Sequence, residues 1–321
     1  MYYYLFAFIA LLLLELLYFR LARMFNIVDT PNYRSSHTRP VLLGGGIIFF
    51  LSLLFYFFTN QFSFPFFMMG ATVVAVVSFV DDLRGVPSYL RLLAQVLAIG
   101  LCFGMQVVGM ELWKDLLIMI VFVAVLNIFN FMDGINGMLA LSSLVFLATF
   151  GLMDLFLLPF IDIRFIVTVF LSVLLFAFFN CRRKARCFSG DVGSVTLGLI
   201  VLYVLVKYVY GVSSNGLAVS YLSFLLVFLA DGGLTVLKRF LNGKNIFQPH
   251  REHMYETLVN ELKVPHLKVS VGYALVQAAI NGGYFLVSDK NLYCFVCAVL
   301  LVLVYGLFFF FFNRKSEKDV Q

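Results

Sequence analysis

Long apolar runs recur along the whole chain, and short polar segments separate them. A membrane-spanning helix needs about 20 predominantly apolar residues, and runs near this length occur from one end of the chain to the other. The pattern predicts eleven helices, at residues 2–19, 44–59, 64–80, 90–109, 115–130, 138–153, 160–179, 193–211, 217–237, 269–288 and 291–312.

These runs predict an all-α, polytopic membrane protein with one integral-membrane domain over residues 1–321. The composition agrees, because 62% of the residues are hydrophobic and 12% are charged. A soluble domain would carry about a quarter charged residues. The first run, Tyr2 to Phe19, lacks the basic start and the small-residue cleavage site of a signal peptide, so we expect it to be retained as a helix.

The connections between the runs alternate between long, basic segments and short segments with few charges. All but four of the 23 Lys and Arg residues fall in the basic set or in the C-terminal tail; the exceptions are Lys114, Arg164, Lys207 and Lys290. Because basic loops stay on the cytoplasmic side, we expect the N-terminus outside and the C-terminus inside a bacterial inner membrane. The net charge of +6 follows from this bias, so it indicates no nucleic-acid partner.

The chemically unusual segments all fall on the predicted cytoplasmic side. They are residues 29–40, Asp81-Asp82, residues 127–137, residues 189–194 and residues 250–255. Scattered loop residues would divide between the two faces of the membrane. The one-sided distribution predicts a single site at the inner ends of the helices.

Carboxylates form one part of this set. Asp81 and Asp82 are adjacent at a helix end, where each is costly unless it is paired or bound to a cation. Asp133 and Asp191 stand beside glycines, which allow close backbone approach. Three carboxylate sites on one face favour a hard divalent cation such as Mg²⁺, which takes one or two carboxylates and completes its shell with phosphates and water. The alternative is a solvated loop start in which Arg84 neutralises one charge.

Basic and histidine residues form the other part. Arg34, His37 and Arg39 lie early in the chain, and His250, Arg251 and His253 lie late. Their chemistry suits phosphate binding. Zinc is a weaker interpretation, because the local sequence supplies no Cys and no third ligand. A solvated basic loop is the remaining alternative.

Three further aspartates lie elsewhere. Asp231 falls inside the run 217–237, about two helical turns before its inner end, and we expect an interior polar partner to hold it. Asp154 and Asp162 lie near the outer edge, where we expect them to be solvated.

In order and spacing, these segments resemble the polyprenyl-phosphate N-acetylhexosamine-1-phosphate transferases of glycosyltransferase family 4. The family's aspartate pair falls on Asp81 and Asp82, and its glycine–aspartate loop falls on Asp191. Its N-x-x-N-x-x-D-G motif falls on Asn127, Asn130, Asp133 and Gly134. Arg34-Ser-Ser-His37 and the segment from His250 to Tyr255 are most similar to the O-antigen and surface-polysaccharide branch.

The resemblance implies the reaction and its participants. The enzyme would transfer an N-acetylhexosamine-1-phosphate from a UDP-sugar to undecaprenyl phosphate in the bilayer and release UMP, as the first step of O-antigen or other envelope polysaccharide synthesis. Mg²⁺, with Mn²⁺ as an alternative, would be the cofactor, and a homodimer is an expected assembly. An ion-coupled transporter is the rival class, but a transporter usually places its polar sites near the midplane, between repeats.

The resemblance also assigns residues to roles. Asp81, Asp82 and Asp133 would be catalytic, and Asp191 would be the metal ligand. Substrate binding would fall on Asn127, Asn130, Asn136, Arg34, His37, His250, Arg251 and His253. Asn136 departs from the pattern, because many bacterial members have Asp there, so this loop brings one negative charge fewer. We expect direct attack by the acceptor phosphate, with a base role for the aspartate pair as second choice.

Overall fold

A computed structural model describes residues 2–31, 39–107, 112–212, 218–245 and 251–318. The helices and strands in this part of the chain are α1 Tyr2–Met24, β1 Val28–Asp29, β2 Val41–Leu42, α2 Ile47–Thr59, α3 Pro65–Arg84, α4 Ser88–Val107, α5 Leu112–Phe131, α6 Met138–Phe156, α7 Ile163–Asn180, α8 Gly190–Val212, the 3₁₀ helix η1 Val219–Leu225, α9 Leu226–Leu241, α10 Met254–Asn260, α11 His266–Leu286 and α12 Lys290–Lys318. The short strands β1 and β2 pair antiparallel, with Val28 opposite Leu42.

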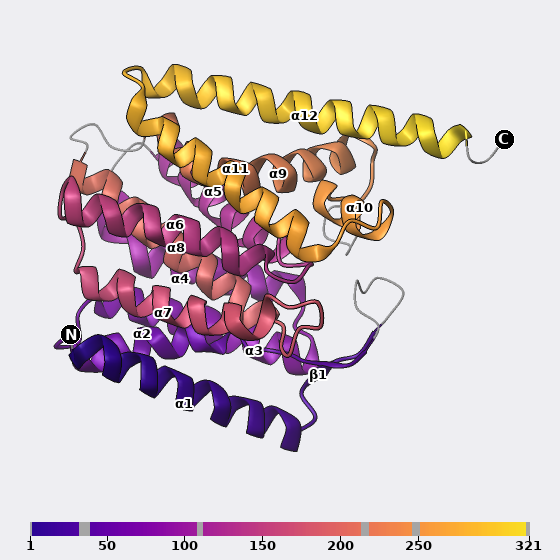
Figure 1. The fold of residues 1–321 in the computed structure, drawn as a ribbon. Helices are drawn as coiled ribbons and strands as arrows, with labels where there is room; N and C mark the ends of the chain where they lie inside the picture. Colours follow the sequence, from indigo (N-terminus) through magenta and orange to yellow (C-terminus); the bar gives the residue numbers. More distant parts are fainter. Residues whose placement is uncertain (1, 32–38, 108–111, 213–217, 246–250, 319–321) are drawn as a thin grey trace.

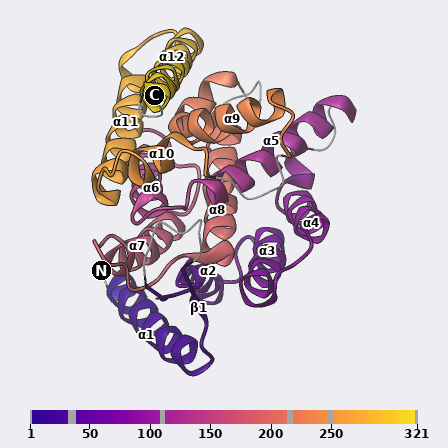
Figure 2. The ribbon, with the colours of Figure 1, turned by 90° about the vertical axis from the view of Figure 1, so that its right-hand side faces the viewer.

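Helix α8 is the centre of the bundle, and the other helices surround it (Figures 1 and 2). Its apolar stretch is 94% buried, and it packs against α2, α3, α5 and α6. Helix α12 is the opposite case. It lies along one edge beside α9 and α11, and only 6% of its apolar stretch is buried. A helix that is apolar all round suits either an interior position or contact with lipid, and the two helices occupy these two places.

The predicted membrane character is confirmed in its coarse form. Within the described residues, eight helices are long and apolar enough to cross a membrane, and Ile47–Thr59 and Ser88–Gly104 are shorter apolar helices. Every predicted range overlaps a helix. The number of eleven spans and the orientation of the termini stay predictions. The β1–β2 pair and the short helix α10 were not predicted.

The predicted helix 217–237 differs from the structure at its start, where η1 precedes α9. Gln277 of α11 stabilises this change of helix type. Its side-chain amide donates to the carbonyl of Ser223 at 2.9 Å, and its carbonyl accepts from the N–H of Val227 at 3.0 Å. The backbone groups freed at the junction are therefore hydrogen-bonded, as buried backbone groups must be.

Two carboxylates accept backbone hydrogen bonds at the C-terminal end of α6 and the N-terminal end of α7. We call this end of the bundle the outer end and the opposite end the inner end, after the predicted orientation. Asp154 is 5% exposed, and its Oδ1 accepts from the N–H groups of Phe160 and Ile161 at 2.8 and 3.0 Å. Asp162 accepts from the N–H of Arg164 and caps α7. The expectation that Asp154 is solvated is therefore wrong, because the chain after α6 folds back over it.

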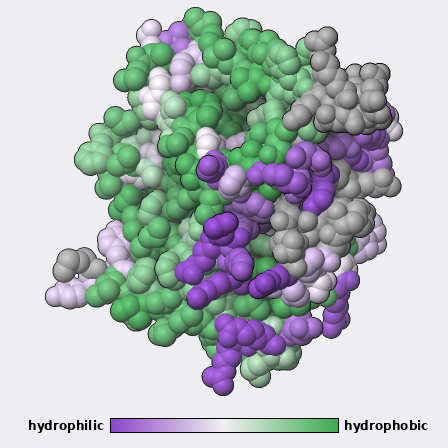
Figure 3. Space-filling model, turned by 45° about the vertical axis from the view of Figure 1, so that its right-hand side comes forward, coloured by the Kyte–Doolittle hydropathy of each residue, from purple (hydrophilic) through white to green (hydrophobic). Residues whose placement is uncertain are grey.

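The polar segments gather at the other end of the molecule. Figure 3 shows hydrophilic side chains at the end where β1 and α10 lie, while hydrophobic side chains cover most of the rest of that face. This distribution fits a chain whose middle lies in hydrocarbon and whose chemistry lies at one membrane surface.

Candidate active site

Asp82, near the C-terminal end of α3, caps the N-terminus of α8. Its Oδ1 accepts from the N–H of Asp191 at 2.8 Å, and its Oδ2 accepts from the N–H of Val192 at 3.0 Å. The first N–H groups of a helix have no partner within that helix, and the helix dipole favours a negative charge there. Both oxygens of Asp82 are thus engaged by backbone, which fixes α3 against α8 at the site.

Gly190 makes this contact sterically possible. Its φ of +70° is favourable only for glycine, and a Cβ added there would lie 2.5 Å from Oδ2 of Asp82. The structure therefore requires a glycine at position 190. It lets the start of α8 approach the carboxylate, and it places the Asp191 side chain beside the aspartate pair.

Arg91, in the first turn of α4, joins the other two carboxylates. Its Nη1 donates to Oδ2 of Asp81 at 2.9 Å and to Oδ2 of Asp191 at 3.3 Å. The two carboxyl groups also interact with each other. The sequence analysis missed this role and counted Arg91 only as a basic residue of an inner connection. The available signal was its place one turn into the helix that follows Asp81-Asp82.

Asp133 reaches the same region from the segment between α5 and α6. It accepts a hydrogen bond from the hydroxyl of Ser189, which directly precedes α8. Burial raises the pKa of Asp133 to about 8, an effect that the Ser189 hydrogen bond opposes. The group is therefore able to hold a proton near neutral pH.

Asp82, Asp133, Gly190 and Asp191 line one cleft with a volume of about 320 Å³, whereas Asp81 and Arg91 are not part of its lining. Its lining comes from segments that are far apart in the sequence: Asp29, Leu43, Asp82, Asn130, Phe131, Asp133, Gly134, Ile135, Asn136, Asn180, Phe188, Gly190, Asp191, Tyr255, Glu256 and His266. Each of the five polar segments predicted to form one site contributes at least one of these lining residues, so the predicted gathering is seen among the described residues. The cleft is rich in oxygen atoms and open on one side.

The comparison with protein families concerns the same part of the chain. Residues 64–209 match the family model described as glycosyl transferase family 4. That stretch runs from the start of α3 through most of α8, so it contains Asp81, Asp82, Asp133 and Asp191. Over this stretch the chain is similar to glycosyl transferase family 4.

Individual proteins are similar to the chain over most of its length. The chain is 24% identical to an undecaprenyl-phosphate alpha-N-acetylglucosaminyl 1-phosphate transferase of Salmonella typhi, over 81% of this chain and 74% of that protein. A protein of the same name from Yersinia pestis is 27% identical over the same shares. Another from Thermotoga maritima is 26% identical over 87% of this chain and 89% of that protein.

The three asparagines that the sequence analysis assigned to substrate binding, Asn127, Asn130 and Asn136, have different surroundings. Asn130 and Asn136 line the cleft. Asn130 accepts from the hydroxyl of Ser194 at 3.1 Å, and Asn136 donates to the carbonyl of Arg182 at 2.7 Å. Asn127 lies one turn deeper in α5, where its amide donates to Gln95 at 2.8 Å. It belongs to the framework behind the cleft rather than to its lining.

His253 precedes α10 and is 2% exposed. Its side chain caps that helix, its Nδ1 lies 3.6 Å from Oδ1 of Asp231, and its ring stacks on Tyr255. In this structure it faces the protein interior and does not line the cleft. Arg251 is half-buried next to this segment. Arg34, His37 and His250 lie outside the described residues.

Asp231 has the interior partners that the sequence analysis predicted. Its Oδ1 accepts from the N–H of Met254 at 2.9 Å, and its Oδ2 accepts from the N–H of Tyr255 at 3.1 Å and from the Tyr273 hydroxyl at 2.6 Å. Asp231 therefore holds the start of α10 in place. That helix brings Tyr255 and Glu256 to the cleft, and burial raises the pKa of Glu256 to about 7.

The donor set of the cleft suits a magnesium ion. No group of three or more His, Cys, Asp or Glu side chains in the described part of the chain forms a metal site by itself. A Mg²⁺ ion that is completed by substrate phosphates and water needs only one or two carboxylates. Asp191 meets this need, because it lines the cleft, and the Asp81 carboxyl group lies next to it on the same nitrogen of Arg91.

Proposed function

We propose that this chain transfers an N-acetylhexosamine-1-phosphate from a UDP-sugar to undecaprenyl phosphate and releases UMP. The printed names of the similar proteins describe such transferases, with undecaprenyl phosphate as acceptor. The observation that carries the proposal is the cleft, in which carboxylates from α3, α8 and the segment after α5 converge beside a helix N-terminus. A diphosphate and a cation both find partners in such a place.

The chemistry is a phosphoryl-type substitution at the β-phosphorus of the donor. An oxygen of the acceptor phosphate forms a new P–O bond to that phosphorus, and the bond from the phosphorus to the bridging oxygen breaks. UMP leaves with that oxygen. A phosphate monoester has a second pKa near 6, so the acceptor is mostly dianionic at pH 7. Direct attack therefore needs little help from a base, and a base or covalent role for Asp81 or Asp82 is the second choice.

Mg²⁺, or Mn²⁺ in its place, would neutralise charge on the donor diphosphate. Asp191 would hold it, with Asp81 adjacent. Asn130 and Asn136 would contact the donor, because both line the cleft. Arg34, His37, His250 and Arg251 would supply phosphate contacts, and the buried His253, predicted to do so, would instead position the start of α10 beside Asp231. These roles follow the resemblance and the chemistry of the side chains.

The setting proposed for this reaction is the bacterial inner membrane, with the cleft on the cytoplasmic face and the acceptor tail in the bilayer. The basic residues of the inner connections support this orientation. The step would initiate O-antigen or another envelope polysaccharide, and a homodimer is the proposed assembly. The transporter alternative has no support among the similar proteins named above, which are transferases.

The reaction is tested with purified protein, undecaprenyl phosphate, Mg²⁺ and a panel of UDP-sugars. We expect UMP release with a UDP-N-acetylhexosamine, a lipid product whose mass includes one extra sugar phosphate, and loss of both on adding EDTA. Reactions without acceptor serve as the control for hydrolysis. Release of UDP in place of UMP would mean an ordinary glycosyl transfer and would overturn the proposal.

A further inference from the structure

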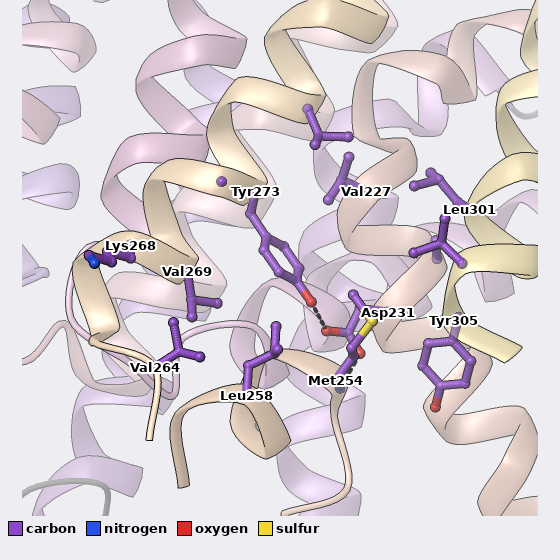
Figure 4. A pocket seen from close by; sticks show the side chains of 14 residues that line it. Val227, Asp231, Met254, Leu258, Val264, Lys268, Val269, Tyr273, Leu301 and Tyr305 are labelled. Carbon is purple, nitrogen blue, oxygen red and sulfur yellow. Dashed lines mark hydrogen bonds between the residues drawn. The ribbon is translucent and has the colours of Figure 1, made fainter. Parts of the chain in front are cut away.

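A second cavity lies between α9, α10, α11 and α12, with a volume of about 350 Å³ (Figure 4). Its lining is almost entirely apolar: Val227, Ala230, Asp231, Met254, Leu258, Val264, Lys268, Val269, Gly272, Tyr273, Val276, Leu301, Val304 and Tyr305. We call it the rear pocket. It shares no lining residue with the cleft, although the two are separated only by the segment around α10.

The one carboxylate in the rear pocket, Asp231, already accepts hydrogen bonds from the protein. Asp231 accepts from Met254, Tyr255 and Tyr273, as Figure 4 shows in part, and it is 3% exposed. The surface offered to an occupant is therefore hydrocarbon. Val276 and Val304 at the rim are 45% and 53% exposed, on helices at the edge of the bundle. In a membrane-spanning chain this rim faces lipid.

Lys268 gives the rear pocket a charged end. It lies in the first turn of α11, two residues after His266, which lines the cleft, so it is at the same end of the molecule as the active site. Its side chain is exposed and has no hydrogen-bond or ion-pair partner in the described ranges. An apolar pocket with a free ammonium group at one end matches an acyl chain attached to an anionic headgroup.

We propose that the rear pocket binds an acyl chain of an anionic phospholipid of the inner leaflet, with the headgroup phosphate at Lys268. Engineered apolar cavities of about 150 Å³ exclude water and accept small hydrocarbons, and this pocket is larger. In a membrane, the hydrocarbon that can fill such a pocket is a lipid chain from the bilayer. A second protein chain is a poorer fit, because a pocket of about 350 Å³ with a charged group at one end matches a single acyl chain better than a helix face.

The bound lipid supports the active site through α10. Met254 and Leu258 face the rear pocket, while Tyr255 between them faces the cleft. The Tyr255 hydroxyl donates to the carbonyl of Phe131 at 2.7 Å, and a Cβ on Gly134 would lie 2.3 Å from its oxygen. Tyr255 thus packs tightly against the segment that carries Asp133. A lipid chain in the rear pocket would therefore pack against the same helix that makes this contact.

Gly272 offers a clean way to block the pocket. No atom lies within 4 Å of a Cβ placed there, so a leucine side chain enters open space rather than displacing protein. Gly282 is the matched control, because it is on the same helix, also has nothing within 4 Å, and does not line the rear pocket. Both substitutions replace a helical glycine with leucine and change helix propensity equally.

The test uses the full chain in nanodiscs of equal parts phosphatidylglycerol and phosphatidylcholine, and native mass spectrometry reads the retained lipid. The unsubstituted chain and Gly282→Leu should retain phosphatidylglycerol, and Gly272→Leu should lose it. Equal retention by Gly272→Leu would overturn the proposal. So would a competition in which undecaprenyl phosphate displaces the retained phospholipid, because the pocket would then belong to the acceptor tail.

Lys268→Gln tests the headgroup without changing the packing. The preference for phosphatidylglycerol over phosphatidylcholine should fall about fivefold, the contribution of one lysine near a membrane surface. Lys184→Gln, an exposed lysine of the inner connection before α8, should leave the preference unchanged. Equal losses in both variants would mean general surface charge and would overturn the Lys268 assignment. Lipid retention is measured without turnover, so a failure of the proposed reaction would not affect this result.

Discussion

The inner and outer ends of the bundle both contain buried or half-buried aspartates, but the aspartates use their oxygens differently. At the outer end, a single oxygen of Asp154 accepts both N–H groups of residues 160 and 161. At the inner end, Asp82 uses both oxygens on the start of α8, and Asp81 and Asp191 share Arg91. In the described part of the chain, the inner end surrounds a cleft that several carboxyl groups line.

The difference shows how to separate structural from chemical carboxylates in a membrane protein. An aspartate whose partners are all backbone donors has a structural role, because backbone N–H groups already stabilise its negative charge. A carboxylate that lies beside other carboxylates and opens to a cleft carries a negative charge that a bound cation or substrate can neutralise. By this criterion Asp154 has a structural role, and Asp191 is available to bind a cation or substrate. Asp82 meets both descriptions.

The largest effect is expected for Asp191→Asn. Removing the proposed metal ligand should lower turnover on the order of a thousandfold, because charge stabilisation by a bound cation amounts to several kcal/mol and each 1.4 kcal/mol is a factor of ten. Thermal stability should stay close to that of the unsubstituted enzyme. Turnover is measured as UMP release, and metal binding is measured with Mn²⁺ by electron paramagnetic resonance. Full activity in this variant would refute the metal assignment.

Asp82→Asn should lower both stability and turnover. An asparagine has one carbonyl oxygen, so its NH₂ group would face the N–H of Asp191 or of Val192, where the aspartate now has an oxygen. The loss of a charged helix cap should cost about 1–2 kcal/mol of unfolding free energy. Thermal melts and UMP release per folded molecule measure the two effects. A variant with reduced turnover and unchanged stability would contradict the capping role.

The smallest effect is expected at the outer end. Asp154→Asn keeps the Oδ1 acceptor for both N–H groups, so stability should change little and turnover per folded enzyme should not change. Asp154→Ala leaves two buried N–H groups without a partner and should cost about 1–3 kcal/mol for each. The pair of variants is compared by thermal melts and UMP release. Loss of turnover in Asp154→Asn would break the contrast between the two ends.

The helices were predictable because apolar runs of membrane length mark them directly. The site was partly predictable, since Asp82, Asp133 and Asp191 fall in polar segments on one predicted side of the membrane, and Asp133 and Asp191 stand beside glycines. The reason for Gly190 was not visible, because it depends on Asp82 approaching from a helix more than a hundred residues earlier. The predicted roles of Arg34, His37 and His250 stay predictions.

Other features could not be predicted from the sequence, because they depend on how the helices are arranged in space. The pairing of Arg91 with Asp81 and Asp191 depends on the angle between α3 and α4, which hydrophobic patterns do not encode. An interior partner for Asp231 was predicted from the cost of a charge in hydrocarbon. Its identity was not, because the donors belong to a segment 23 residues further along the chain.

The burial of α8 has a consequence for how the protein assembles. The helix is apolar enough to enter a membrane by itself, yet in the finished bundle it has almost no contact with lipid. Insertion and packing are separate stages for membrane helices. Its neighbours must therefore close around α8 after it is inserted, and they expel lipid as they do so. The start of the same helix carries Asp191, so the catalytic cleft is completed only in that last stage, and a half-assembled chain has no cleft with which to consume the donor.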